Sequence, residues 1–178
     1  VIIPVKNLIV IMSLPIVISM LIQAMYNLVD SVFVAQINPD ALTAVGMAFP
    51  MQSLMIAFQT GLGVGMNALV SRYLGQKKPY EAGLAATHSL ILTALNYVVF
   101  LIVGLTALPA FFSIQTHSEV IANYGVEYLS IVCCGSFGLF FQIYGERILQ
   151  ATGKALLSMV SQILGAVINI VLDPIFIF

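Results

Sequence analysis

The sequence predicts an all-α fold, a polytopic membrane helix bundle. Of the 178 residues, 61% are hydrophobic and only 7% are charged, whereas a soluble domain carries roughly 25% charged residues. Apolar runs long enough for the roughly 20 residues of helix that cross a bilayer follow one another along the chain. The formal net charge of −1 gives no support for binding of nucleic acid.

Turn-forming residues divide these runs into five predicted transmembrane helices within one domain, residues 1–178. The turns are expected at Asn38-Pro39-Asp40, Gly75 to Pro79, Pro109 to Ser118 and Ala151-Thr152-Gly153. The helices are predicted over residues 7–36, 41–71, 82–108, 119–146 and 154–178. Because the chain starts at Val1 and stops inside the last apolar run, we expect it to be part of a longer protein.

The first predicted helix carries an acid where lipid is expected. Residues 7–29 contain no charge, Asp30 follows them, and apolar residues then resume. Helical spacing puts Gln23, Asn27 and Asp30 on one face, which should line a cavity or the bundle interior rather than lipid. The other interpretation is that Asp30 lies at the headgroup interface. Pro15 removes one backbone hydrogen bond and permits a kink.

The second and third predicted helices carry packing signals. The glycines at 61, 63 and 65 lie inside an apolar run and lack the spacing of a dinucleotide-binding turn. Gly61 and Gly65 fit the small-xxx-small pattern, so we expect them to let another helix approach closely. His88, near the start of the third helix, is interpreted as a hydrogen-bonded structural histidine.

The fourth predicted helix has polar side chains near both ends. Tyr128 either hydrogen-bonds a carboxylate or belongs to the interfacial aromatic belt, and the sequence alone favours the belt. Glu146 and Arg147 are interpreted as an ion pair or as part of the cytoplasmic rim. Cys133 and Cys134 are adjacent and point to different faces, which argues against a disulfide or a metal site.

The fifth predicted helix carries the second intramembrane acid. Residues 155–172 contain no charge before Asp173, and Asn169 lies one helical turn earlier on the same face. Pro174 cannot donate a backbone hydrogen bond and can free a carbonyl oxygen nearby. These oxygens suit an alkali cation, and a desolvated carboxylate can instead exchange a proton. The alternative interpretation is that Asp-Pro simply ends the helix.

The basic residues all fall on one side of this predicted topology. They lie before the first helix, after the second and after the fourth: Lys6, Arg72, Lys77, Lys78, Arg147 and Lys154. The positive-inside rule therefore places the N-terminus and these two turns in the cytoplasm.

The residues alone favour transport over catalysis. A transporter would use Asp30 and Asp173 for ion coupling, because a charge at bilayer depth costs at least about 2.5 kcal/mol and marks a functional site. A membrane-embedded enzyme would use them as a catalytic dyad or as metal ligands. The sequence lacks a His/Cys/Asp cluster of ligand spacing, a nucleophile elbow and a phosphate-binding loop. We therefore expect neither an enzyme nor a cofactor, and the residues do not identify the substrate.

Several motifs, in order along essentially the whole chain, resemble those of multidrug and toxic compound extrusion (MATE) transporters, closest to the prokaryotic DNA-damage-inducible branch. The motifs are Leu14-Pro15, Tyr26 to Val34, Ala41 to Gly46, Phe49-Pro50, Gly61 to Gly65, Val70 to Gly75, Leu149 to Gly153 and Asn169 to Phe176. The resemblance implies twelve helices in two six-helix lobes, of which this chain would supply the first five helices of the N-terminal lobe.

The resemblance also implies roles for individual residues. Asp30, Asn169 and Asp173 match the N-lobe site for the coupling ion, either H⁺ or a Na⁺ held by these three side chains. Tyr128 matches a tyrosine near that site, and Pro15 matches the proline where the family's first helix bends. Gln23 and Asn27 share the face of Asp30 and are candidates for lining the substrate cavity. Glu146 falls near positions that line the lobe cavity in some relatives.

The expected function is therefore antiport: export of cationic, amphipathic drugs in exchange for H⁺ or Na⁺ across the cell inner (plasma) membrane. The implied partners are membrane lipid, small cationic substrates and the C-terminal lobe of the same polypeptide, with no nucleic acid. The alternative from the wider superfamily is a flippase for lipid-linked oligosaccharides, which tends to need basic residues for a pyrophosphate. No Lys or Arg lies deep in a predicted helix, which disfavours that alternative.

Overall fold

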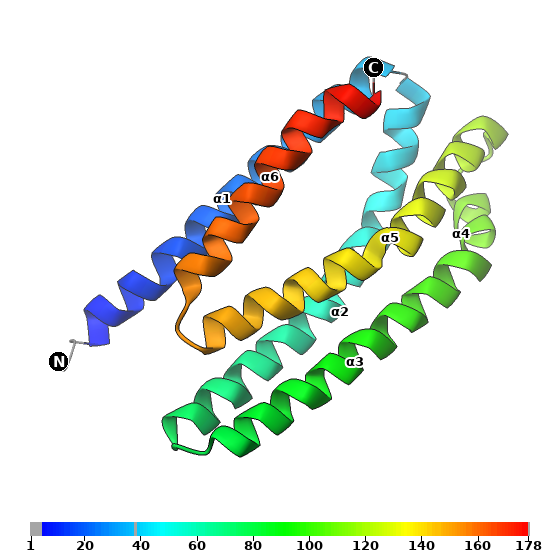
Figure 1. Ribbon diagram of the computed structural model, residues 1–178. Helices are drawn as coiled ribbons and strands as arrows, with labels where there is room; N and C mark the ends of the chain where they lie inside the picture. Colours follow the sequence, from blue (N-terminus) through cyan, green and yellow to red (C-terminus); the bar gives the residue numbers. More distant parts are fainter. Residues whose placement is uncertain (1–4, 38, 178) are drawn as a thin grey trace.

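The computed structural model describes residues 5–37 and 39–177, except for the side chains of some residues in α1 and near the end of α6. Six helices joined by short turns make up this part of the chain, so the predicted all-α membrane bundle is confirmed (Figure 1). The helices are α1 (Val5–Ile37), α2 (Pro39–Gly75), α3 (Pro79–Thr106), α4 (Leu108–Gln115), α5 (Glu119–Ala151) and α6 (Ala155–Ile177).

Apolar residues cover most of the length of the long helices. In the described part of the chain, four stretches are long and apolar enough to cross a membrane: α2, α3, α5 and residues Ala155–Leu172 of α6. In α1 the apolar stretch identified in the same way covers Ser13–Met25. Many large hydrophobic side chains are exposed on these helices, as expected where lipid rather than water surrounds them.

The short helix α4 lies where the sequence predicted only a turn between Pro109 and Ser118. Pro109 occupies the first turn of α4, where the missing backbone N–H has no helical partner to lose. Phe112 is fully buried, and its ring lies against Gly125 of α5. The burial of Leu108 and Phe112 against α5 therefore stabilises a helix that is too short to form by propensity alone.

The helices form two groups. The helices α2, α3 and α5 pack on one another, and α1 packs along α6 as a separate pair (Figure 1). Contacts of α1 with α2 and of α5 with α6 join the two groups. Pairing of α1 with α6 makes neighbours of the two helices that carry Asp30 and Asp173 in the sequence.

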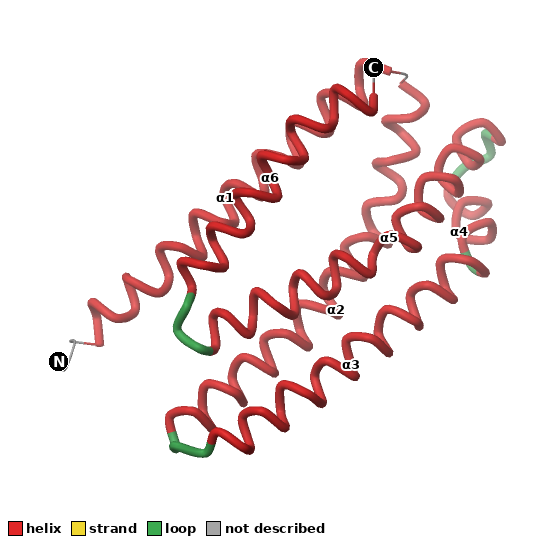
Figure 2. Tube along the Cα trace, in the orientation of Figure 1, coloured by secondary structure: helices red, strands yellow, loops and turns green. Residues whose placement is uncertain are grey.

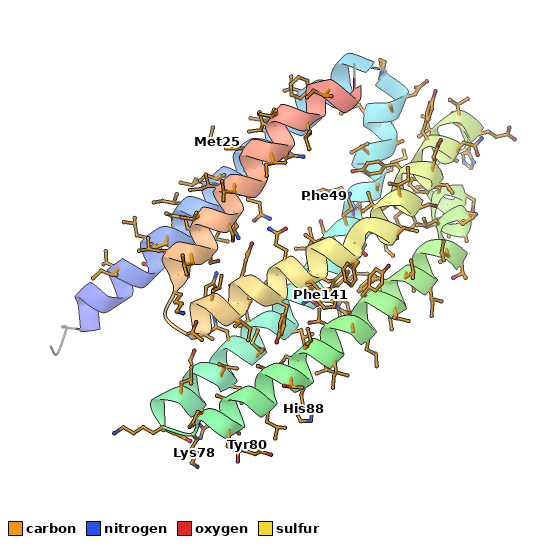
Figure 3. All side chains as sticks on the ribbon, in the orientation of Figure 1. Met25, Phe49, Lys78, Tyr80, His88 and Phe141 are labelled. Atoms are coloured by element: carbon orange, nitrogen blue, oxygen red, sulfur yellow. The ribbon has the colours of Figure 1, made fainter. Side chains whose placement is uncertain are left out.

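Helix α2 changes direction in its first half, near Phe49 (Figures 1 and 3). Pro50 lies inside the helix at this place. Proline cannot donate to the carbonyl four residues earlier and its ring crowds that carbonyl, which accounts for the bend. The first part of α2 therefore extends from the bend toward the end of α1, while Ala48 stays in the core with α4 and α5.

Apolar side chains from α2 to α5 form the main core. Its largest fully buried members are Met55, Leu108, Phe112, Leu129 and Phe140. A buried polar group lies within this core: Gln59 of α2 donates from Nε2 to Thr93 Oγ1 at 3.1 Å and to the Phe140 carbonyl at 3.2 Å. Asn96 Nδ2 donates to Gln59 Oε1 at 3.2 Å, so one glutamine joins three helices.

The turns that carry the basic residues lie at one end of the bundle. The turn from α2 to α3 and the turn from α5 to α6 are drawn as loops at the end nearer the N-terminus (Figure 2). Lys78 and Tyr80 lie at the first of these turns and extend from its surface (Figure 3). His88 on α3 points away from the bundle and its Nδ1 is 2.8 Å from the Leu84 carbonyl oxygen, as expected for a structural histidine.

At Gly104, helix α3 packs closely on α5. A Cβ at this position would lie 2.5 Å from Cys133 Cβ, which cannot move without the helix that carries it. We expect Gly104→Ala to destabilise the full-length protein by about 1–3 kcal/mol, because overpacking forces the helices apart. The midpoint of thermal unfolding in detergent, followed by size-exclusion chromatography of heated samples, measures this effect.

Gly83 on the same helix provides the matched control, since a Cβ there meets nothing within 4 Å in the part of the chain that the structure describes. Gly83→Ala should be neutral or stabilise the helix by up to about 1 kcal/mol, because alanine is the better helix former. Equal midpoints for the two variants would contradict the close packing of α3 on α5.

Candidate functional site

A cavity of about 480 Å³ lies between the two groups of helices. It is lined by residues from α1, α2, α5 and α6, and about half of them are polar. The polar lining residues are Ser19, Gln23, Thr60, Gln142, Glu146, Arg147, Gln150, Gln162 and Asn169. A concave site with a few convergent polar groups is the usual form of a small-molecule site.

On the side of α1 and α6, the cavity is lined by uncharged polar side chains. Gln23 of α1 and Asn169 of α6 both line it, as does Ser19, which is buried. Met25 is 66% exposed and projects from the outer side of α1 (Figure 3). The face of α1 that bears Gln23 is therefore directed inward, where the sequence predicted a polar stripe.

The other predicted members of this group lie outside the described side chains. Asn27 and Asp30 belong to α1 and Asp173 to α6, but only the helical backbone is described at these positions. Among the described residues, no group of three His, Cys, Asp or Glu side chains is placed to hold a metal ion. The ion-coupling roles of Asp30, Asn169 and Asp173 therefore stay predictions.

Tyr128 of α5 contacts the neighbouring helix α2. It is half-buried against the main core, and Gln52 Nε2 of α2 donates to its hydroxyl oxygen at 3.0 Å. This contact joins α5 to α2 at some distance along the helix from the polar cavity residues that begin at Gln142. The hydroxyl of Tyr128 therefore contacts an amide and not a carboxylate among the described residues, and its place in the aromatic belt and its relation to the ion site stay predictions.

Pro15 lies within an uninterrupted helix. It is buried, and its carbonyl oxygen accepts a hydrogen bond from Ser19 Oγ at 2.9 Å. Proline cannot donate a backbone hydrogen bond to the carbonyl four residues earlier. Helix α1 therefore lacks one backbone hydrogen bond in the turn that precedes Ser19, a residue of the cavity lining. The position suits a bend, although α1 is helical through it.

Glu146 is buried rather than part of an exposed rim. Its side chain is 9% exposed and lines the cavity. Gln142 Nε2 donates to Oε1 at 3.0 Å, and Gln162 Nε2 of α6 donates to Oε2. Helix α5 continues to Ala151, beyond the predicted end at residue 146, so Glu146 lies inside the helix and faces α6.

Arg147 also lines the cavity and lies one turn before the end of α5, so one basic residue reaches the cavity from near the helix end. Its Nη1 donates to Gln150 Oε1 at 3.0 Å, and Gln150 Nε2 donates to Ser158 Oγ of α6 at 3.3 Å. The predicted ion pair with Glu146 is replaced by this arrangement. Each charged group is held by amide side chains instead of by the other.

The side chain of Arg147 packs against Gly63, the middle one of the three glycines at positions 61, 63 and 65 of α2. A Cβ at Gly63 would lie 2.8 Å from Arg147 Cγ, so the methylene stem of the arginine passes directly over this glycine. Among the described residues, a Cβ at Gly61 or Gly65 would meet nothing within 4 Å. Within the described part of the chain, the close packing is therefore at Gly63, and Gly61 and Gly65 lie on another face of the helix, where their packing role stays a prediction.

Sequence reasoning did not identify the glutamines of this site. Gln142, Glu146 and Gln150 are spaced four residues apart, as are Ser158 and Gln162. This spacing puts each set on one helix face. A search for repeated polar residues at that spacing in apolar helices would have found both sets.

The chain is similar to known membrane transporters over nearly its whole length. The sequence profile of the MatE family matches residues 15–175. A Multidrug export protein MepA from Staphylococcus haemolyticus is 28% identical over 168 residues, which cover 93% of this chain and 37% of the relative. An FAD transporter from Shewanella oneidensis is 25% identical over 175 residues, or 98% of this chain and 39% of the relative.

A solved structure agrees with the fold. A MOP superfamily transporter from Pyrococcus furiosus, described with reverse polarity of its binding pocket, superposes with a TM-score of 0.92 at 36% identity. The match covers 97% of this chain and 38% of that protein. The chain thus spans about two-fifths of the length of the proteins it resembles, as expected for most of one lobe of two.

Proposed function

Since the chain belongs to the MatE family of membrane transporters, we propose that it is most of the N-terminal lobe of a drug exporter. The full-length protein would expel cationic, amphipathic compounds in exchange for H⁺ or Na⁺. The cavity between α1, α2, α5 and α6 carries the proposal, because it offers polar groups and a buried acid within an apolar bundle.

The coupling ion is assigned to Asp30, Asn169 and Asp173. Asn169 lines the cavity on α6, and position 173 lies one turn further along the same helix. Position 30 lies two turns beyond Gln23 on the paired helix α1. Either a proton or Na⁺ would neutralise the carboxylates and favour a different packing of α1, for which Pro15 is the bend point.

The described lining of the cavity holds a single basic residue, fewer than an anionic cargo would need. A flippase for a lipid-linked pyrophosphate, or a carrier of an anionic cofactor like the one named for the Shewanella relative, would need several basic groups. Arg147 is one such group, but its stem is fixed on Gly63 and an acid lies beside it in the cavity. We keep the anionic cargo as the second candidate on the strength of Arg147.

The bilayer and the missing lobe complete the proposed protein. The protein would lie in the cell inner membrane with its N-terminus in the cytoplasm, because the turns with Lys77, Lys78 and Lys154 lie at one end of the bundle. The partner surfaces are membrane lipid and the C-terminal lobe, which would close the cavity from the other side.

The full-length protein reconstituted in liposomes tests the proposal. We expect a fluorescent cationic dye to move against its own gradient when an opposing H⁺ or Na⁺ gradient is imposed. Dissipating the gradient with an ionophore should stop this movement. Dye movement that is the same with and without both ion gradients would contradict antiport, and accumulation of an anionic dye instead would favour the second candidate.

A further inference from the structure

The cavity contains an acid that the proposed coupling group does not use. Glu146 lies about five residues before the end of α5, and its partner Gln162 lies near the start of α6. At about 1.5 Å of rise per residue, Gln162 and Asn169 are about 10 Å apart along the axis of α6, and position 173 is about 16 Å from Gln162. The two acidic sites are therefore separate.

Glu146 is held by amide donors from two helices. Amide N–H groups of Gln142 and Gln162 donate to its two carboxylate oxygens, and these oxygens keep further lone pairs that can accept from a ligand. Arg147 donates to Gln150, which lies one turn nearer the α5–α6 turn. Among the described residues, Glu146 has no ion pair, and an uncompensated charge in a bilayer is costly.

A second observation points to the chemistry of the missing cation. Gln162 Oε1 is buried and has no hydrogen-bond partner in the described structure, although its own Nε2 holds Glu146. A buried acceptor without a donor is unfavourable, so this oxygen can accept a hydrogen bond from a water or a ligand in the cavity. A ligand that carries both a positive charge and an N–H would satisfy Glu146 and this oxygen together.

We propose that Glu146 and Gln162 Oε1 bind the protonated amine of the exported substrate. This proposal rests on the proposed function, since it takes the cavity as the substrate site. The proposal assigns different roles to two acidic sites. Asp30, Asn169 and Asp173 bind the coupling ion, and Glu146 binds the exported substrate. The proposal also narrows the cargo to protonated primary, secondary or tertiary amines, because a quaternary ammonium has no N–H for Gln162.

Equilibrium binding to the purified full-length protein tests this assignment. The probes are a tertiary-amine dye, its N-methylated quaternary analogue and an uncharged analogue of the same ring system. In Glu146→Gln we expect the amine dye to bind about ten- to a hundredfold more weakly, the loss expected for a charge-assisted hydrogen bond. Binding of the uncharged analogue should change little, and Glu146→Asp should recover part of the affinity for the amine.

A second variant examines the amide oxygen. In wild type the tertiary amine should bind more tightly than its quaternary analogue, and Gln162→Leu should remove this preference. Glu127→Gln is the matched control, because Glu127 is an exposed acid on the same helix and does not line the cavity. No ion gradient is present in these measurements, so a failure of coupled transport would leave their outcome unaffected.

Three results would overturn the proposal. One is unchanged affinity for the amine in Glu146→Gln. Another is an equal loss for charged and uncharged probes, which would show that Glu146 only holds α5 on α6. If Glu146→Gln does not fold, binding to the wild-type protein decides. Equal affinities for the amine and the uncharged analogue would then overturn the assignment. Tighter binding of the amine in wild type, with loss of this preference in Gln162→Leu, would support it.

Discussion

We expect Asp30→Asn and Asp173→Asn each to abolish gradient-driven export by the full-length transporter. Asparagine keeps the size and hydrogen-bonding capacity of aspartate but cannot take up a proton or neutralise Na⁺. Loss of one charged ligand should weaken ion binding by about ten- to a hundredfold, since bonds to charged groups contribute about 1.5–3 kcal/mol. Proteoliposomes loaded with a cationic dye under an imposed H⁺ or Na⁺ gradient measure the effect.

Asp40→Asn is the matched control for these variants. Asp40 is exposed in the first turn of α2, outside the cavity, so its amide variant should export the dye at the wild-type rate. Wild-type export by Asp30→Asn and Asp173→Asn would remove both residues from the coupling mechanism. It would leave the amine-binding role of Glu146 open to its own binding test.

The long helices and the place of Gln23 on the cavity side of α1 could be predicted because their signals are local. Hydrophobic runs and turn residues appear in consecutive positions, and the spacing of Gln23 is read within one helix. The helix α4 could not be predicted in this way. Its stability depends on the fit of the Phe112 ring against Gly125, a contact between separate segments of the chain.

The environment of Glu146 was missed for a similar reason. A charged pair near a predicted helix end is typical of a solvated rim, and the sequence does not show that α5 continues to Ala151 or that α6 folds back beside it. The donors that hold Glu146 come from two helices. The spacing of Gln142 before Glu146 was nevertheless visible, and it follows the same rule that identified Asn169 and Asp173.

The second large effect is expected at Gln59, which is 1% exposed in the core of α2, α3 and α5. Gln59→Leu removes both bonds that its amide donates and the bond that it accepts from Asn96. Interhelical hydrogen bonds in membrane proteins average about 0.6 kcal/mol with a maximum of about 1.7, so three predict a loss of about 2–5 kcal/mol. The thermal unfolding midpoint in detergent reports it, and Gln115→Leu at the exposed end of α4 is the control.

Most of this loss should come from the partners that Gln59 leaves behind. Thr93 is fully buried and would keep a hydroxyl without its donor, and Asn96 would lose the acceptor for its amide. The Phe140 carbonyl keeps its bond within α5. Replacing all partners of a buried polar group by apolar ones can be nearly neutral, so Gln59→Leu combined with Thr93→Val and Asn96→Leu should be more stable than Gln59→Leu alone. If the destabilisation of the triple variant instead equals the sum of the three single effects, Gln59 stabilises the protein by its own contacts and not by satisfying the polar groups of Thr93 and Asn96.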